Sequence, residues 1–273
     1  MSRANILTFV VLALAPVLAV AAEAPSTAAK LSAAEIVQKN VAARGGLREW
    51  RGVQSLSWSG KMDAGGNNQR SLKVPGMPAP PPPKDPTAQV QLPFVLEMKR
   101  GHKSRLEIEF NGQTAVQVYD GARGWKVRPF LNRHEVESFT ADELKVAAIQ
   151  ADLDGALIDY AAKGTTVEVE GTERVEGTEA YKLKLTLRNK QVLHEWIDAK
   201  SFLEVKLEGT PRRLDAKVHP VSIFLRDYQA VNGLMIPHVI ETSVQGLQRT
   251  EKIRIEKVVV NPRLDESRFA KPS

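Results

Sequence analysis

The 273-residue chain contains no cysteine. It therefore forms no disulfide, has no thiol nucleophile and offers no cysteine for lipid attachment behind an N-terminal leader. A protein without cross-links depends on its apolar core, and about 250 residues are enough to build one. The length alone allows one large β domain or two small domains.

Motifs that carry catalysis are also missing. The five histidines are scattered without a His-Glu-x-x-His spacing, and there is no Gly-x-Ser-x-Gly elbow or glycine-rich phosphate loop. Asp152 and Asp154 stand close to Asp142 and Glu143, but helix capping and solubility account for these carboxylates. We expect no enzymatic activity, no metal and no other cofactor. An enzyme would need polar side chains that converge inside the fold, for example His194 with Asp152 and Asp154.

Aromatic residues make up only 6% of the chain, and they do not alternate with basic residues along strands. Nucleic acid is therefore not an expected partner. The net charge of +6 is spread over alternating Lys and Glu positions rather than gathered in blocks. This pattern favours a solvated sheet face, and an anionic lipid or protein surface is the second interpretation.

The N-terminus has the features of a secretory signal peptide. Arg3 precedes an apolar run from Ile6 to Val20, and the run ends in small residues. We expect residues 1–22 to be removed and residues 23–30 to form a flexible leader. The mature protein is then a single domain over residues 31–273, located in the periplasm.

Strand patterning dominates the rest of the chain. Residues 93–130 contain four short alternating segments, and the pair Asn111-Gly112 predicts a tight hairpin between two of them. Alternation resumes at Val167 and continues to Val260. We expect a mainly β (α+β) fold, in which about eleven antiparallel strands form an unclosed, strongly curved barrel.

Two capping boxes predict the helices. Ser32 to Glu35 begins a helix of about three turns, and Thr140 to Glu143 begins another, followed by a looser second helix through Tyr160. The segment at 63–87 holds seven of the sixteen prolines, so it cannot enter a central strand and is expected to be an exposed insertion.

So many strands with so little helix leave the apolar face of the sheet incompletely covered. Two outcomes remain open, a core filled by side chains and a hollow cavity that accepts an apolar ligand. The expected cavity lining consists of Phe94, Leu96, Met98, Leu106, Ile108, Phe110, Val116, Val118, Leu183, Leu185 and Leu187. The expected helical lid contributes Leu144, Ile149 and Leu157.

A series of short motifs resembles the periplasmic lipoprotein-sorting superfamily that includes LolA, LolB and RseB. The motifs are ARGG at 43–46, PFVLEMKR at 93–100, QVYDGARGW at 117–125, DGALIDY at 154–160, YKLKLTLRN at 181–189, VNGLMIPH at 231–238 and IEKVVVNPRLDESRF at 255–269. The resemblance implies an unclosed β-barrel with helices as a lid over an apolar cavity, and no enzymatic activity. Within the superfamily, the chain most resembles the longer outer-membrane lipoprotein-sorting proteins.

Together, the pattern and the resemblance predict a periplasmic carrier that shields acyl chains during transfer towards the outer membrane. Its expected partners are a lipid or acylated lipoprotein and an inner-membrane transporter or outer-membrane acceptor. The alternative is an RseB-like lipid sensor that binds a membrane protein.

Overall fold

The computed structural model describes residues 31–63, 90–129, 132–214 and 216–272. The expected signal peptide, the leader and nearly all of the proline-rich insertion lie outside these residues. The strands are β1 Ser55–Asp63, β2 Gln91–Lys99, β3 Lys103–Phe110, β4 Gln113–Tyr119, β5 Gly124–Arg128, β6 Arg133–Ser138, β7 Thr166–Val175, β8 Thr178–Thr186, β9 Val192–Asp198, β10 Glu204–Leu214, β11 Lys217–Val231, β12 Leu234–Val244 and β13 Thr250–Val260.

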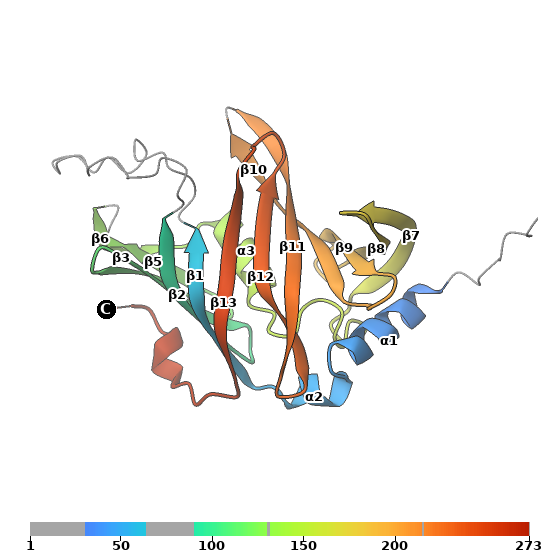
Figure 1. The fold of residues 1–273 in the computed structure, drawn as a ribbon. Coiled ribbons are helices and arrows are strands. Elements are labelled where there is room, and N and C mark those ends of the chain that lie inside the picture. The colour runs from blue at the N-terminus through green and yellow to red at the C-terminus, as the bar shows by residue number, and fades with distance from the viewer. Residues whose placement is uncertain (1–30, 64–89, 130–131, 215, 273) are drawn as a thin grey trace, which may run out of the picture. The chain divides into compact units, whose positions relative to one another are not determined.

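All these strands belong to one antiparallel sheet of 13 strands (Figure 1). The order is β6-β5-β4-β3-β2-β1-β13-β12-β11-β10-β9-β8-β7, so the sheet is unclosed, with β6 and β7 at its edges. The fold class is as the sequence predicts, but the expected count of about eleven strands is too low. Strand β6 in particular has one apolar residue, Val136, and therefore lacks the alternation by which strands are recognised.

The first and last strands meet in the middle of the sheet. Leu56 of β1 pairs with Val260 of β13, and the register slips by one residue of β13 between Ser59 and Gly60. A Cβ atom on Gly60 would overlap the backbone carbonyl of Arg254, so only glycine allows the two strands to come this close. This bulge lies at the junction of the N-terminal meander, β1 to β6, and the C-terminal meander, β7 to β13.

The predicted hairpin at Asn111-Gly112 is present between β3 and β4. Both residues have positive φ angles, 51° and 72°, as a two-residue turn of this hand requires.

The described residues also form three short α-helices and one 3₁₀-helix: α1 Ala33–Ala43, α2 Leu47–Gly52, α3 Ala141–Gln150 and η3 Glu266–Phe269. Ser32 and Thr140 cap α1 and α3 through the two predicted capping boxes. The prediction of a looser second helix through Tyr160 is wrong. Residues 151–164 form a series of turns instead, and Gly155 and Asp159 in this segment have positive φ angles. Within the described residues, no helix is long and apolar enough to cross a membrane.

The inner face of the sheet is covered in three sections. Helix α3 packs Ala147 against Tyr119 of β4. Helix α2 and the turn segment 151–164 pack Trp50, Leu153 and Ile158 against β1, β2 and β12. Helix α1 lies near β7, and its Asn40 side chain donates a hydrogen bond of 2.8 Å to the carbonyl of Phe202.

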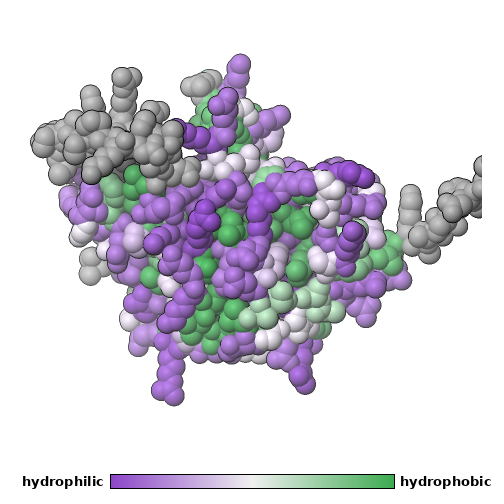
Figure 2. Space-filling view, in the orientation of Figure 1, coloured by the Kyte–Doolittle hydropathy of each residue, from purple (hydrophilic) through white to green (hydrophobic). Residues whose placement is uncertain are grey.

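The outer face is largely charged, and hydrophilic side chains dominate the view in Figure 2. Ion pairs cross neighbouring strands, such as Lys184 with Glu168 and Arg226 with Glu241. The main apolar cluster on the outer side of β4 and β5 joins Val118 and Trp125 to Phe269 of η3. The C-terminal segment therefore covers the outer apolar side chains of this end of the sheet.

We expect Gly60→Ala to destabilise the protein by about 2 to 3 kcal/mol, because the added methyl group forces β1 and β13 apart. Urea unfolding measures this loss. Gly52→Ala is the control, since no atom lies within 4 Å of its added Cβ, and it should leave stability unchanged or raise it by up to about 1 kcal/mol. Equal stability of the two variants would contradict the structure of the β1–β13 bulge.

Candidate ligand-binding pocket

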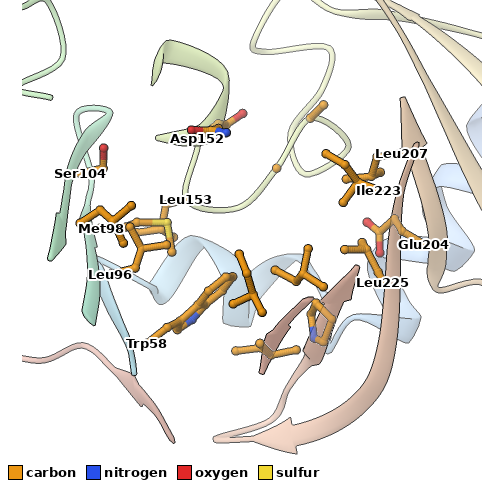
Figure 3. Close-up of a pocket in the computed structure, with 18 of the residues that line it drawn as sticks. Trp58, Leu96, Met98, Ser104, Asp152, Leu153, Glu204, Leu207, Ile223 and Leu225 are labelled. Atoms are coloured by element: carbon orange, nitrogen blue, oxygen red, sulfur yellow. The ribbon is translucent and has the colours of Figure 1, made fainter. Parts of the chain in front are cut away.

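A pocket of about 460 Å³ remains on the inner face, between the sections covered by α1 and α3. This volume falls within the range of small-molecule sites, about 300–1,000 Å³. Most of its lining is apolar (Figure 3). The inner face is therefore neither fully packed nor open along its whole length.

The first wall comes from β1, β2 and β3. The side chains of Trp58, Leu96 and Leu106 lie side by side because Leu96 pairs with both of the others across the sheet. Phe94 and Met98 lie two residues away on the same strand and share this face. The five residues form a continuous apolar surface along the pocket.

The opposite wall comes from β10, β11 and β12. Leu207 pairs with Ile223, which in turn pairs with Thr242, so the three side chains form a row across the strands. Figure 3 shows Leu207, Ile223 and Leu225 facing Leu96, Met98 and Trp58 across the pocket. An elongated apolar group can thus contact both walls at once.

The cover of the pocket consists of α3 and the turn segment 151–164. Ala147, Gln150, Leu153 and Ala156 contribute to the lining from this side. Small side chains at Ala147 and Ala156 leave space that larger residues would fill. The expected lid region thus lies over the pocket, although its closest residues differ from the ones predicted.

Among the residues expected to line a cavity, five belong to this lining: Phe94, Leu96, Met98, Leu106 and Val118. Val118 reaches the pocket only as part of the stretch Gln117–Tyr119, because its side chain packs outward against Trp125 and Phe269.

The other expected lining residues lie elsewhere. Val116 belongs to the outer cluster, because β4 directs Ala115, Gln117 and Tyr119 inward, the opposite parity from the one predicted. Leu183 and Leu185 are completely buried and do not line the pocket, and Leu187 follows the end of β8. Ile108 and Phe110 of β3 also lie outside the lining.

The three expected lid residues are placed differently as well. Leu144 packs beside Tyr119 and Ala147, and Ile149 is half-buried on α3 without reaching the lining. Leu157 is fully buried and belongs to a separate groove beside α1, which Val37 and Tyr160 also line. Turns in residues 151–164, where a second helix was expected, change which side chains face the pocket.

No sequence pattern predicted the polar end of the pocket, which is formed by Arg44, Glu195, Glu204 and Tyr228. Arg44 follows α1, and its guanidinium lies 4.4 Å from the centre of the Trp50 ring. Its Nη1 atom is 3.2 Å from Glu204 Oε1 and donates a hydrogen bond of 2.9 Å to the carbonyl oxygen of Asp154. The Tyr228 hydroxyl donates to the carbonyl of Glu204 at 2.9 Å.

Glu195 of β9 differs from its neighbours because, among the described residues, its side chain has no hydrogen-bond or ion-pair partner. It lines the pocket, and only 9% of the residue is exposed. Burial, followed by the charge of Glu204, raises the pKa of the Glu195 carboxyl to about 8. Glu195 is therefore a neutral acid in the folded protein at pH 7.

A charged network fixes the turn segment above this end. Asp154 is 2% exposed and accepts hydrogen bonds from Arg100 and from Lys163, the latter at 2.6 Å. Lys163 also contacts both carboxylate oxygens of Asp152 at 2.9 Å. Burial raises the pKa of Asp152, whereas for Asp154 the bonds from Lys163 and Arg100 outweigh burial and lower the pKa.

The polar cluster considered for an enzyme does not form as expected. His194 contacts Glu208 and Glu170 on the outer face, whereas Asp152 and Asp154 lie on the inner side. Among the described residues, no group of three or more His, Asp or Glu side chains is placed to hold a metal ion.

Comparisons with known proteins identify the fold. No family model matches the sequence, and no curated protein matches it. A LolA superfamily protein from Nitrosomonas europaea is 14% identical and has a TM-score of 0.53, over 88% of this chain and 98% of that one. A DUF1329 family protein from Desulfovibrio piger is 13% identical, with a TM-score of 0.53 over 87% of this chain and 97% of that one.

A putative outer membrane lipoprotein-sorting protein domain from Vibrio parahaemolyticus is also 13% identical, with a TM-score of 0.51, over 87% of this chain and 95% of that one. At such identities the likeness concerns the fold alone. The predicted resemblance to the lipoprotein-sorting superfamily is thus confirmed at the level of the fold.

The buried acid predicts a pH dependence of stability. The folded state keeps the Glu195 proton up to about pH 8, whereas the unfolded state releases it near the ordinary pKa of 4.5. The free energy of unfolding should therefore fall as pH rises through this window, by up to a few kcal/mol. Urea unfolding at several pH values between 5 and 9 measures this change in the free energy of unfolding.

Glu195→Gln should flatten this slope and stabilise the protein at pH 8, while the control Glu168→Gln on the outer face should keep the slope. A wild-type stability that is constant from pH 5 to pH 8 would contradict the burial of an ionisable Glu195.

Asp154→Asn should destabilise the protein by about 2 to 3 kcal/mol, because Arg100 and Lys163 lose their shared buried carboxylate. It should also speed proteolytic cleavage within residues 151–164. The control Asp142→Asn changes a side chain that is 91% exposed, so it should shift stability by less than about 0.5 kcal/mol. Equal cleavage rates in the two variants would argue against the role of Asp154 in fixing the turn segment.

Proposed function

We propose that this chain, which has the fold of the lipoprotein-sorting superfamily, is a non-enzymatic carrier of acyl chains. The observation that carries the proposal is the pocket on the inner face, where two apolar walls enclose about 460 Å³ instead of packing together. A soluble domain gains stability by closing such a gap. An unfilled space between two apolar walls is therefore expected in a protein whose ligand occupies that space.

Binding in this pocket is driven by the burial of methylene groups. Each one removed from water contributes about 0.8 kcal/mol, so a chain of several methylenes is retained without any reactive side chain. The row of Leu96, Leu106 and Trp58 on one wall and Leu207 and Ile223 on the other provides contacts along such a chain. The affinity should therefore rise with the length of the acyl chain.

Exchange of the ligand requires movement of the cover, because α3 and residues 151–164 lie across the pocket. We assign the lid function to this cover. It is attached to the sheet by the Tyr119–Ala147 contact at one end. At the other end, Leu153 and Ile158 pack on the sheet and Asp154 forms an ion pair with Arg100, which follows β2. Loosening either attachment opens a path to solvent while the sheet remains intact.

The site of action follows from the N-terminal sequence. The signal peptide expected at residues 1–22 supports a periplasmic location. Acyl chains there must cross an aqueous space between two membranes. The structural neighbour from Vibrio parahaemolyticus carries the description of an outer membrane lipoprotein-sorting protein, which supports a lipid or lipoprotein as cargo. A membrane protein on either side would then supply and receive the cargo.

Leu96→Gln tests the pocket directly. The amide in the apolar wall should weaken binding of a fluorescent fatty-acid analogue by at least about tenfold, because its burial leaves polar atoms unpaired. Val95→Gln is the matched control, since Val95 neighbours Leu96 but pairs with Glu107 on the outer face. Fluorescence titration gives both affinities. Equal affinity of the two variants for the analogue would refute the proposal.

Native mass spectrometry of the protein purified from its own periplasm tests the cargo. The expected result is an added mass that organic extraction releases as a lipid or an acylated peptide. A protein without any bound lipid, which also fails to bind the fluorescent analogue, would overturn the carrier function.

A further inference from the structure

The polar end of the pocket contains more carboxyl groups than cationic side chains. The carboxylates of Asp152, Asp154, Glu195 and Glu204 lie within one network with the cations Arg44, Arg100 and Lys163. With every group ionised, four negative charges face three positive ones. The cluster therefore lacks one positive charge.

Glu195 is the carboxyl group that has no cationic partner. Arg44 is occupied by Glu204 and the carbonyl of Asp154, while Lys163 is occupied by Asp152 and Asp154. Glu195 is nine-tenths buried, lines the pocket and has no hydrogen-bond partner among the described residues. A ligand group that enters the pocket can therefore supply the partner that the Glu195 carboxyl lacks among the described residues, and this hydrogen bond would contribute to binding.

Two features disfavour an anionic ligand. Among the described residues, Arg44 is the one cation in the lining, and it already has a carboxylate partner. Three acidic side chains line the same end, namely Asp152, Glu195 and Glu204. A phosphate or carboxylate would meet repulsion without gaining a free guanidinium. An ammonium group would instead supply the missing charge and up to three hydrogen-bond donors.

We propose that the pocket binds an amphiphile with a primary ammonium group, which pairs with Glu195 at the polar end while the apolar chain lies between the two walls. This inference rests on the proposed function, since it assigns the polar group of the same ligand. When the ammonium enters, the Glu195 carboxyl releases one proton to solvent, and the resulting carboxylate neutralises the ligand. The other groups facing Glu195, which are Arg44, Asp152, Lys163, Glu204 and Tyr228, keep the contacts described above.

Three ligands with the same chain separate the contributions of the two ends: decylamine, decan-1-ol and decanoate. Isothermal titration calorimetry at pH 8 should show decylamine binding at least about tenfold more tightly than the alcohol, and decanoate more weakly than both. Because the proton must leave Glu195, the affinity for decylamine should rise at least about tenfold from pH 6 to pH 8. Titrations in buffers of different ionisation enthalpy should show about one proton released near pH 6.5.

Glu195→Gln should reduce the affinity for decylamine at least about tenfold and change that for decan-1-ol less than about threefold. It should also abolish the proton release. The wild-type proton count tests the inference independently of how this variant folds.

Equal affinities for the amine and the alcohol, or amine binding without proton release, would overturn the ammonium site and leave the carrier function intact. Failure of all three ligands to bind would overturn both the ammonium site and the carrier function. An affinity for decylamine that falls as pH rises to 8 would also overturn the inference, since it would mean that Glu195 binds the ligand in its protonated form.

Discussion

The structure depends on one constraint: a single sheet of 13 strands has an inner apolar face that three short α-helices and a turn segment must cover. Each helix covers one part of this face. Helix α1 lies near β7, α2 closes the region around Leu56, and α3 packs on Tyr119. The space that they leave unfilled between themselves and the sheet is the pocket. The cavity is therefore a consequence of the ratio of strand to helix, as well as of the residues that line it.

Electrostatics divide the pocket into two unlike ends. The walls from β1 to β3 carry no ionised group in the lining, whereas Arg44, Glu195 and Glu204 gather at the other end. In a medium that screens charge poorly, each ionised group needs a partner. Arg44 pairs with Glu204, and Asp154 pairs with Arg100 and Lys163, whereas Glu195 has no such partner and its raised pKa keeps it protonated. The same network holds the turn segment over the pocket. The cover and the polar end are thus linked through shared side chains.

Much of the fold could be predicted from local sequence. Alternation located most strands, the capping boxes at Ser32 and Thr140 located two helices, and Asn111-Gly112 located a hairpin. These signals are local because each depends on backbone geometry within a few residues. The face to which a side chain points was less predictable.

β-Bulges are one reason why the face to which a side chain points is hard to predict. On β13, Ile253 and Ile255 share the inner face with Val258 because the register slips at Glu256, and on β10 both Glu204 and Leu207 line the pocket. Val118 turned outward for another reason, since Phe269, 151 positions later in the chain, provides an apolar partner on the outer side. The polar end combines Arg44, Glu195, Glu204 and Tyr228 from four separate segments. No spacing rule connects residues that meet only through the curvature of a sheet.

The pairing of the first strand with the last has a consequence for how the protein acquires its activity. One wall of the pocket comes from β1 to β3 and the other from β10 to β12, and β13 alone joins them at the centre of the sheet. A chain that emerges N-terminus first holds two separate walls, and they are joined only when β13 has followed. The pocket therefore cannot form before the last strand is made, and its assembly must wait until nearly the whole chain is available to fold.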